Sequence, residues 1–186
     1  MAVQVTKRLF DVREYQRLAD AGILSEDDRV ELIHGEIVEM SPIGSPHAAC
    51  VRDLEELLHE KLGRTVHISV QNPIILDDYS EPEPDIALLK RRTHRYKSIH
   101  PKPEDVLLVI EVADTSIEYD RLVKIPLYAR AKISEAWLVD LNREVIQVFS
   151  EPRDGQYQRR HEFRRGEQIG SASIQNLVLG VNDILG

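Results

Sequence analysis

Cysteine is nearly absent from the chain, which contains only Cys50. A single thiol excludes an intramolecular disulfide and a zinc site built from several cysteines. Long apolar stretches are missing too: the N-terminus has no apolar segment of the signal-peptide kind. The longest aliphatic run is Val106–Ile110, whereas a membrane-spanning helix needs about 20 residues. These absences predict a protein of the reducing cytoplasm that makes no use of a membrane.

Positive charge is also scarce. The 186 residues include 24 Lys or Arg against 32 Asp or Glu, which gives a net charge of −8 at pH 7. A non-specific polyanion binder draws its affinity from a basic surface, so the composition disfavours that class. No P-loop, G-x-G-x-x-G or G-x-S-x-G motif occurs in the sequence. Nucleotide-binding and serine-hydrolase functions therefore lack motif support.

The length and the pattern of the chain predict one domain, residues 1–186. Apolar periodicity and turn residues predict a β-hairpin at 30–40, a helix at 45–63, strands at 85–89 and 106–113, and a helix at 117–132 that Pro126 kinks. Strands combined with helices that cover the sheet faces indicate an α/β (α+β) fold, with a mixed β-sheet flanked by helices.

Glu111 interrupts the apolar strand 106–113. A carboxylate in a central strand is costly to bury unless it is paired or binds a cation, although at an exposed strand end it would simply pair with a Lys or Arg. Asp85 begins the strand 85–89. If the two strands are neighbours, the carboxylates converge, and two carboxylates ~4 Å apart repel by about 4 kcal/mol at an effective dielectric of 20. Such a pair invites a shared proton or a divalent cation, for which oxygen ligands favour Mg²⁺ or Mn²⁺. The alternative is two solvated carboxylates that never meet.

Lys124 lies on the following predicted helix and shares a face with Asp120 and Tyr128, at spacing i, i+4, i+8. The simple interpretation is a surface ion pair with Asp120, worth about 0.3–0.5 kcal/mol. The functional hypothesis is that Lys124 reaches towards Glu111, where an ammonium group would position a water and offset negative charge on a phosphate.

Three further groups of residues are candidates. His47 follows a predicted helix start, where it would contact a phosphate or pack on the hairpin. Arg91, Arg92 and Arg95 fall in a stretch without acids, between Lys90 and Lys102. This stretch is either a patch that contacts phosphates or a solvated loop. Glu31 and Glu36 of the hairpin offer a further carboxylate, on faces that alternation alone does not assign.

The order and spacing of these residues resemble the Uma2 family (also called DUF820), bacterial proteins assigned to the PD-(D/E)XK nuclease superfamily. The resemblance runs from about residue 15 to residue 185. The matching segments are Glu31-Leu-Ile-His-Gly-Glu-Ile, Met40-Ser-Pro, His47, Gln71-Asn-Pro, Pro84-Asp85, Val109-Ile-Glu-Val, Asp120, Lys124, Tyr128-Ala129 and Trp137-Leu-Val-Asp140.

The resemblance implies a restriction-endonuclease-like core and a magnesium-dependent endonuclease that acts on DNA. Asp85 and Glu111 match the acids that hold Mg²⁺ (or Mn²⁺) in the superfamily, and Val112 matches the residue whose backbone carbonyl is a further ligand. The superfamily lysine would fall at Ala113, and Lys124 matches branches in which this lysine has moved to the next helix. The resemblance also implies a homodimer.

Two alternatives to a DNA endonuclease stay open at this point. One is a non-catalytic nuclease-like fold that serves as a nucleic-acid or protein interaction module, which the net charge of −8 favours slightly. The other is a metal-dependent hydrolase of a small phosphate ester.

Overall fold

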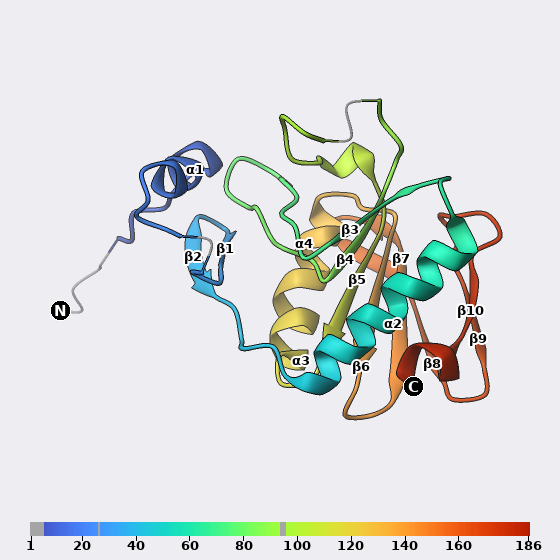
Figure 1. The fold of residues 1–186 in the computed structure, drawn as a ribbon. Coiled ribbons are helices and arrows are strands. Elements are labelled where there is room, and N and C mark those ends of the chain that lie inside the picture. The colour runs from blue at the N-terminus through green and yellow to red at the C-terminus, as the bar shows by residue number, and fades with distance from the viewer. Residues whose placement is uncertain (1–5, 26, 94–95) are drawn as a thin grey trace.

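A six-stranded sheet lies at the centre of the computed structural model, which describes residues 6–25, 27–93 and 96–186 (Figure 1). Its strand order is β3-β4-β5-β6-β7-β8, and neighbouring strands are antiparallel except for the parallel pair β5–β6. The strands are β3 (His67–Val70), β4 (Ile86–Leu89), β5 (Val106–Ala113), β6 (Glu135–Asp140), β7 (Val145–Arg153) and β8 (Gln156–Arg164). Helices cover the sheet on both faces, so the predicted mixed sheet flanked by helices is confirmed.

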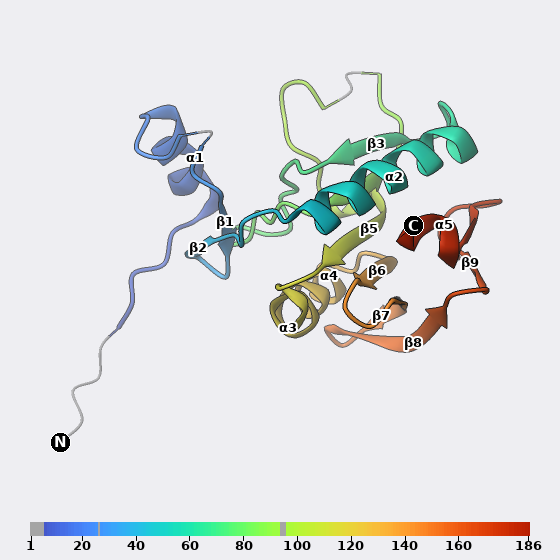
Figure 2. The same ribbon diagram turned by 60° about the horizontal axis from the view of Figure 1, so that its bottom comes forward.

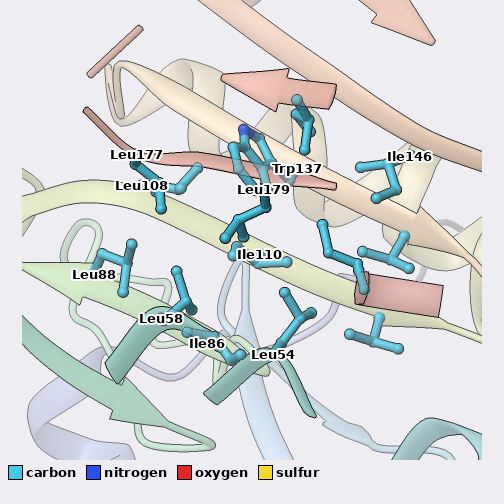
Figure 3. Packing of buried hydrophobic residues seen from close by; sticks show 14 of the residues in the cluster. Leu54, Leu58, Ile86, Leu88, Leu108, Ile110, Trp137, Ile146, Leu177 and Leu179 are labelled. Carbon is cyan, nitrogen blue, oxygen red and sulfur yellow. The ribbon is translucent and has the colours of Figure 1, made fainter. Parts of the chain in front are cut away.

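The first face of the sheet packs against helix α2 (Ser45–Leu62), the short helix α5 (Val181–Leu185) and the small sheet β9–β10 (Gln168–Gly170 and Val178–Gly180). Figure 3 shows Leu54 and Leu58 of α2 lying over Ile86, Ile110 and other apolar residues of the strands. The apolar stripe of α2 thus forms one of the two cores. Gly44 is the N-cap of this helix and Ser45 its first residue, so the helix begins where the sequence predicts it.

The second face of the sheet packs against the segment that connects β5 to β6. Side chains alternate along a strand, so Ala87 and Leu89 of β4 lie in this second core, as do Val109 and Ala113 of β5. The same alternation directs Asp85 and Glu111 to this face. Figure 2 shows α2 on one side of β5 and the connecting helices on the other.

The connecting segment differs from the single kinked helix that the sequence predicts. It consists of α3 (Ile117–Tyr119), a π-helical turn η2 (Asp120–Lys124) and α4 (Ile125–Arg130). In the π turn, the N–H of Ile125 bonds to the carbonyl of Asp120, five residues back. Pro126 follows directly and has no N–H to donate. The helix is therefore interrupted near Pro126, and the interruption is this π turn, which is wider than an α-helical turn. Such turns are frequent at functional sites.

The N-terminal part comprises helix α1 (Val12–Asp20) and the hairpin β1–β2 (Val30–Ile33 and Glu36–Glu39). His34 and Gly35 have φ angles of 52° and 78°, as a tight two-residue hairpin turn requires, which confirms the predicted hairpin. The hairpin rests on the segment before β4, because the N–H of Gly35 donates to the carbonyl of Tyr79 at 2.7 Å. In Figures 1 and 2 it lies off the main sheet, and a short connection leads from it to the start of α2. One short 3₁₀ turn, η1 (Pro103–Asp105), precedes β5. Among the described residues, no helix has the length and apolar character needed to cross a membrane.

Candidate active site

Asp85 and Glu111 meet at one end of the central strands. Ile86 of β4 pairs with Ile110 of β5, so continuing the antiparallel register by one residue sets Asp85 opposite Glu111. The backbone N–H of Asp85 donates to Oε2 of Glu111 at 3.4 Å, and Oδ2 of Asp85 accepts the N–H of Val112 at 2.9 Å. The two carboxylates therefore converge, which is one of the two alternatives that the sequence left open.

Glu111 is buried, with its side chain only 2% exposed. It accepts hydrogen bonds from the Tyr128 hydroxyl and from Nζ of Lys124, the latter at 2.8 Å. Burial raises the pKa of Glu111 to about 8; Lys124 opposes the rise, while Asp120 and Asp85 add to it. Burial also raises the pKa of Tyr128 well above its ordinary value, so its hydroxyl stays a donor.

Lys124 is buried as well, and its side chain is 5% exposed. Its ammonium group contacts three oxygens: Glu111 at 2.8 Å, the Glu83 carbonyl at 3.2 Å and Glu31 at 3.5 Å. Burial alone would lower the pKa of Lys124, but Glu111 and Glu31 outweigh it and hold the pKa well above the ordinary value. Lys124 does not form the surface ion pair with Asp120 that was the simple interpretation of the sequence. Asp120 is buried and accepts a hydrogen bond from Ser116 at 2.6 Å.

Glu31 of the hairpin is buried. The alternation of residues along the hairpin strands could not assign it to a face. Its Oε1 accepts the Tyr119 hydroxyl at 3.1 Å, and its Oε2 accepts the N–H of Glu83 at 3.2 Å. These contacts depend on how the hairpin docks against the rest of the chain, and no local sequence signal carries that information. Glu36, the other candidate, pairs at the surface with Lys7 at 2.9 Å.

His47 lies in the first turn of α2, and its Nε2 is 3.0 Å from Oδ1 of Asp85. This bond raises the pKa of His47. Burial opposes ionisation of Asp85, but the bond from His47 and the charge of Lys124 outweigh it and lower the pKa of Asp85. The Nδ1 atom of His47 is buried without a hydrogen-bond partner in the described structure. Gln71, which the sequence did not single out as a site residue, donates to Asp85 Oδ1 at 3.4 Å.

A cleft of about 320 Å³ surrounds these groups. Its lining combines Asp85, Glu111, Val112 and Lys124 with the hairpin and with the chain from Met40 to Gly44. Acids predominate among the described residues that line it. The acids are Glu31, Glu39, Glu83, Asp85, Glu111, Asp114 and Asp120, and the basic residues are Arg29, His47 and Lys124. This surplus of carboxylates favours the uptake of cations.

The donors at the cleft suit a magnesium or manganese ion. Within the described part of the chain, no group of three or more Asp, Glu, His or Cys side chains lies close enough to hold a metal. Magnesium needs less, since proteins usually bind it through one or two carboxylates and leave several waters on the ion. Asp85 and Glu111 supply two such oxygen donors.

The Val112 carbonyl is a third candidate donor. The N–H and the carbonyl of a strand residue point towards the same neighbouring strand, and the N–H of Val112 points to Asp85. Continuing the register places Pro84 opposite Val112, and proline has no N–H to offer that carbonyl.

The arginines named from the sequence lie elsewhere. Arg91 and Arg92 follow the opposite end of β4 from Asp85 and do not line the cleft. Arg91 donates to the carbonyl of Arg64, and Arg92 pairs with Asp105. Arg95 falls outside the described residues. The structure thus brings Asp85, Glu111, Val112, Lys124 and His47 together and leaves Arg91 and Arg92 apart, because β4 separates the two ends.

Fold and cleft define an α/β protein with a carboxylate-rich site at the end of its central strands. The family model of Uma2, described as "Putative restriction endonuclease", matches residues 12–182. The chain therefore belongs to the Uma2 family.

One solved structure similar to this chain is that of a "putative nuclease belonging to DUF820" from Anabaena variabilis ATCC 29413. It has a TM-score of 0.74 and 16% identity, over 95% of this chain and 97% of that one. At this identity the likeness concerns the fold. The type IIG restriction endonuclease BpuSI matches over 63% of this chain and 14% of its own, with 20% identity and a TM-score of 0.40, which carries no argument. No curated protein sequence matches the chain.

Proposed function

We propose that this protein is a metal-dependent endonuclease that hydrolyses DNA phosphodiester bonds. The observation that carries the proposal is the convergence of Asp85, Glu111 and Lys124 in one cleft at the end of β4 and β5. The description of the Uma2 family supports the same reaction class. Asp85, Glu111 and the Val112 carbonyl would hold Mg²⁺ or Mn²⁺. When bound there, such a cation supplies Lewis-acid polarisation of the scissile phosphate and of a water.

The protein's own groups supply the rest of the chemistry. Hydrolysis adds a water oxygen to phosphorus and breaks one P–O ester bond, and the leaving oxygen takes up a proton. The Lys124 ammonium group orients the attacking water and offsets charge that develops on the phosphate. Glu31 and the Glu83 carbonyl, at 3.5 Å and 3.2 Å, help to hold this ammonium group in place. His47 orients Asp85 and contacts a flanking phosphate.

A cleavage assay with matched variants tests the proposal. We expect the wild type to cut DNA in Mn²⁺, whereas Asp85→Asn fails to cut and fails to bind Mn²⁺. Lys124→Ala should keep Mn²⁺ affinity within a few-fold and lose cleavage. An exposed acid beside the site, Glu118, provides a control: Glu118→Gln should cut like the wild type. Cleavage by Lys124→Ala at the wild-type rate would remove Lys124 from the mechanism.

The net charge of −8 favours one competing proposal, an interaction module without catalysis. It requires that the wild type neither binds Mn²⁺ nor cuts DNA. The single domain over 1–186, the homodimer and the cytoplasmic location stay predictions. Limited proteolysis tests the single domain, sedimentation tests the homodimer, and cell fractionation tests the location.

A further inference from the structure

Tyr128 contacts the candidate active site without lining the cleft. Its side chain lies on helix α4 and is fully buried in the second core. Glu111 and Lys124 line the cleft, whereas Tyr128 is among the described residues that do not. The Tyr128 hydroxyl therefore reaches Oε1 of Glu111 from inside the core. It follows that Tyr128 does not touch a substrate in the cleft, and that any effect it has on the site passes through Glu111.

The two carboxylate oxygens of Glu111 have different partners. Oε1 accepts the Tyr128 hydroxyl and lies 2.8 Å from Nζ of Lys124. A carboxylate oxygen has about two sites for hydrogen bonds, so these two donors occupy Oε1. Among the described residues, Oε2 has one donor, the N–H of Asp85 at 3.4 Å, which is longer than the usual range of about 2.7–3.2 Å. Oε2 is therefore the oxygen with room for another partner, and it lies on the side of Asp85.

The partner of Tyr128 is unusual for a tyrosine inside a core. A buried hydroxyl needs a hydrogen-bond partner, but a backbone carbonyl is sufficient. Tyr157 illustrates this, because its hydroxyl donates to the carbonyl of Ile133 at 2.8 Å. Tyr128 instead donates to a carboxylate that is itself buried. Since its ring is packed in the core, the Tyr128 hydroxyl fixes the orientation of this carboxylate as well as satisfying it.

Lys124 holds the same oxygen but differs from Tyr128 in charge. Its ammonium group attracts Glu111 and repels a cation bound beside it. These two effects oppose each other in Lys124→Ala, which is why that variant should keep Mn²⁺ affinity within a few-fold. The hydroxyl of Tyr128 carries no charge. Its removal therefore releases Glu111 without removing any repulsion of the cation.

We propose that Tyr128 is a positioning residue whose hydroxyl holds Oε1 of Glu111, so that Oε2 stays directed towards Asp85 and available to a divalent cation. This inference rests on the proposed metal-dependent function and adds a residue to it. Side chains that orient a metal-binding carboxylate through a hydrogen bond typically contribute about 10–100-fold to metal affinity or activity.

Calorimetry with Mn²⁺ on a matched pair of variants tests the proposal. Tyr128→Phe removes the hydroxyl and keeps the ring, and we expect its Mn²⁺ affinity to fall about tenfold or more. Tyr157→Phe removes the same atom from a half-buried tyrosine whose ring contacts Phe149, and should bind Mn²⁺ like the wild type. Circular dichroism checks that both variants fold. Unfolded protein would lower the number of binding sites in the titration, whereas loss of positioning lowers the affinity.

Cleavage of DNA gives a second measurement, which a merely structural role would not change in the same way. For Tyr128→Phe, the Mn²⁺ concentration at half-maximal rate should rise about tenfold or more. The rate at saturating Mn²⁺ should be close to that of the wild type, because Tyr128 does not touch the substrate. A variant that is only less stable would lose rate without a change in this Mn²⁺ concentration.

The outcomes separate the role of Tyr128 from the proposed function. Wild-type Mn²⁺ affinity in Tyr128→Phe, or an equal fall in Tyr157→Phe, would overturn the role of Tyr128 and leave the endonuclease function standing. Mn²⁺ binding without cleavage by the wild type would contradict the endonuclease function, and the two affinities would still decide the role of Tyr128. Absence of Mn²⁺ binding to the wild type would overturn both.

Discussion

The two ends of strand β4 carry charged residues in opposite settings. At its beginning, Asp85 lies beside the buried Glu111, and the buried Lys124 joins them. At its end, Arg91 and Arg92 lie at the surface, where one donates to a carbonyl and the other pairs with Asp105. Glu111 and Lys124 are buried, whereas the side chains of Arg91 and Arg92 are exposed to solvent.

This contrast shows that buried charged residues, rather than exposed ones, indicate the functional site. Exposed ion pairs contribute about 0–1 kcal/mol and are common on any surface. Removing one partner from a buried pair costs about 3–5 kcal/mol, because the other charge is left uncompensated. Acids whose pKa values are shifted by burial and by neighbouring charges concentrate at functional sites. The acidic end of β4 therefore carries the proposed function, and the basic end does not.

The largest expected effect comes from Glu111→Gln. The amide retains a bond to Tyr128 but cannot serve as an anionic ligand, so cleavage should fall by about 100-fold or more and Mn²⁺ binding should be lost. Cleavage rates on DNA and calorimetry with Mn²⁺ measure both. Retention of Mn²⁺ affinity would exclude Glu111 as a ligand.

Lys124→Met tests the buried pair through stability. Without metal near pH 8, the free energy of unfolding should fall by about 3–5 kcal/mol, because Glu111 and Glu31 lose their cation. Added Mn²⁺ should restore part of this loss, since it binds the folded state. The exposed Lys61 gives the control, and Lys61→Met should lie within about 0.5 kcal/mol of the wild type in urea unfolding. Equal stabilities of the two variants would contradict the buried ion pair.

Glu81 extends the comparison to a buried acid that, among the described residues, has no cation closer than 3.8 Å. Gln16 donates to it at 3.0 Å, whereas Nε2 of His100 is 3.8 Å away. Burial is the main cause that raises its pKa from 4.5 to about 7. The stability that this shift contributes is fully present below the unfolded pKa of 4.5 and is lost as pH rises to about 7.

Glu81→Gln should therefore match the wild type near pH 4 and exceed its free energy of unfolding by about 1–3 kcal/mol near pH 8. Urea unfolding of both proteins over this pH range measures the difference. A difference that does not change with pH would refute the shift.

The smallest effect is expected at the basic end of β4. The double variant Arg91→Gln, Arg92→Gln removes the positive charges of both arginines at this end of the strand. It should leave Mn²⁺ affinity and the salt dependence of DNA binding as they are, because neither side chain lines the cleft. A fall of about 2 in the salt slope would restore this loop as a phosphate contact.

Local patterns predicted much of this architecture. The hairpin at 30–40 was predicted, and its tight turn falls at His34 and Gly35. Strands 85–89 and 106–113 were predicted as well, and they bring Asp85 and Glu111 together because they pair. The apolar stripe of residues 45–63 marked a helix that covers one sheet face. These features depend on residues close in sequence or on one register.

Other parts of the site depend on docking between distant segments. The spacing of residues along the predicted helix allowed Lys124 either a surface pair with Asp120 or a buried contact with Glu111. The apolar periodicity of residues 117–132 also did not predict the π turn beside Pro126. The contact of Glu31 with Lys124 joins residues 93 positions apart. By contrast, the separation of Arg91 and Arg92 from Asp85 could be read from the sequence, because Asp85 begins the predicted strand 85–89 and the arginines follow its end.

Calorimetric titration of Mn²⁺ into the wild type and into Asp85→Asn tests the central claim most directly, since it requires no knowledge of the substrate. We predict that the wild type binds Mn²⁺ and that binding disappears in Asp85→Asn. Absence of binding to the wild type, or equal binding by both proteins, would contradict a metal site at Asp85 and Glu111.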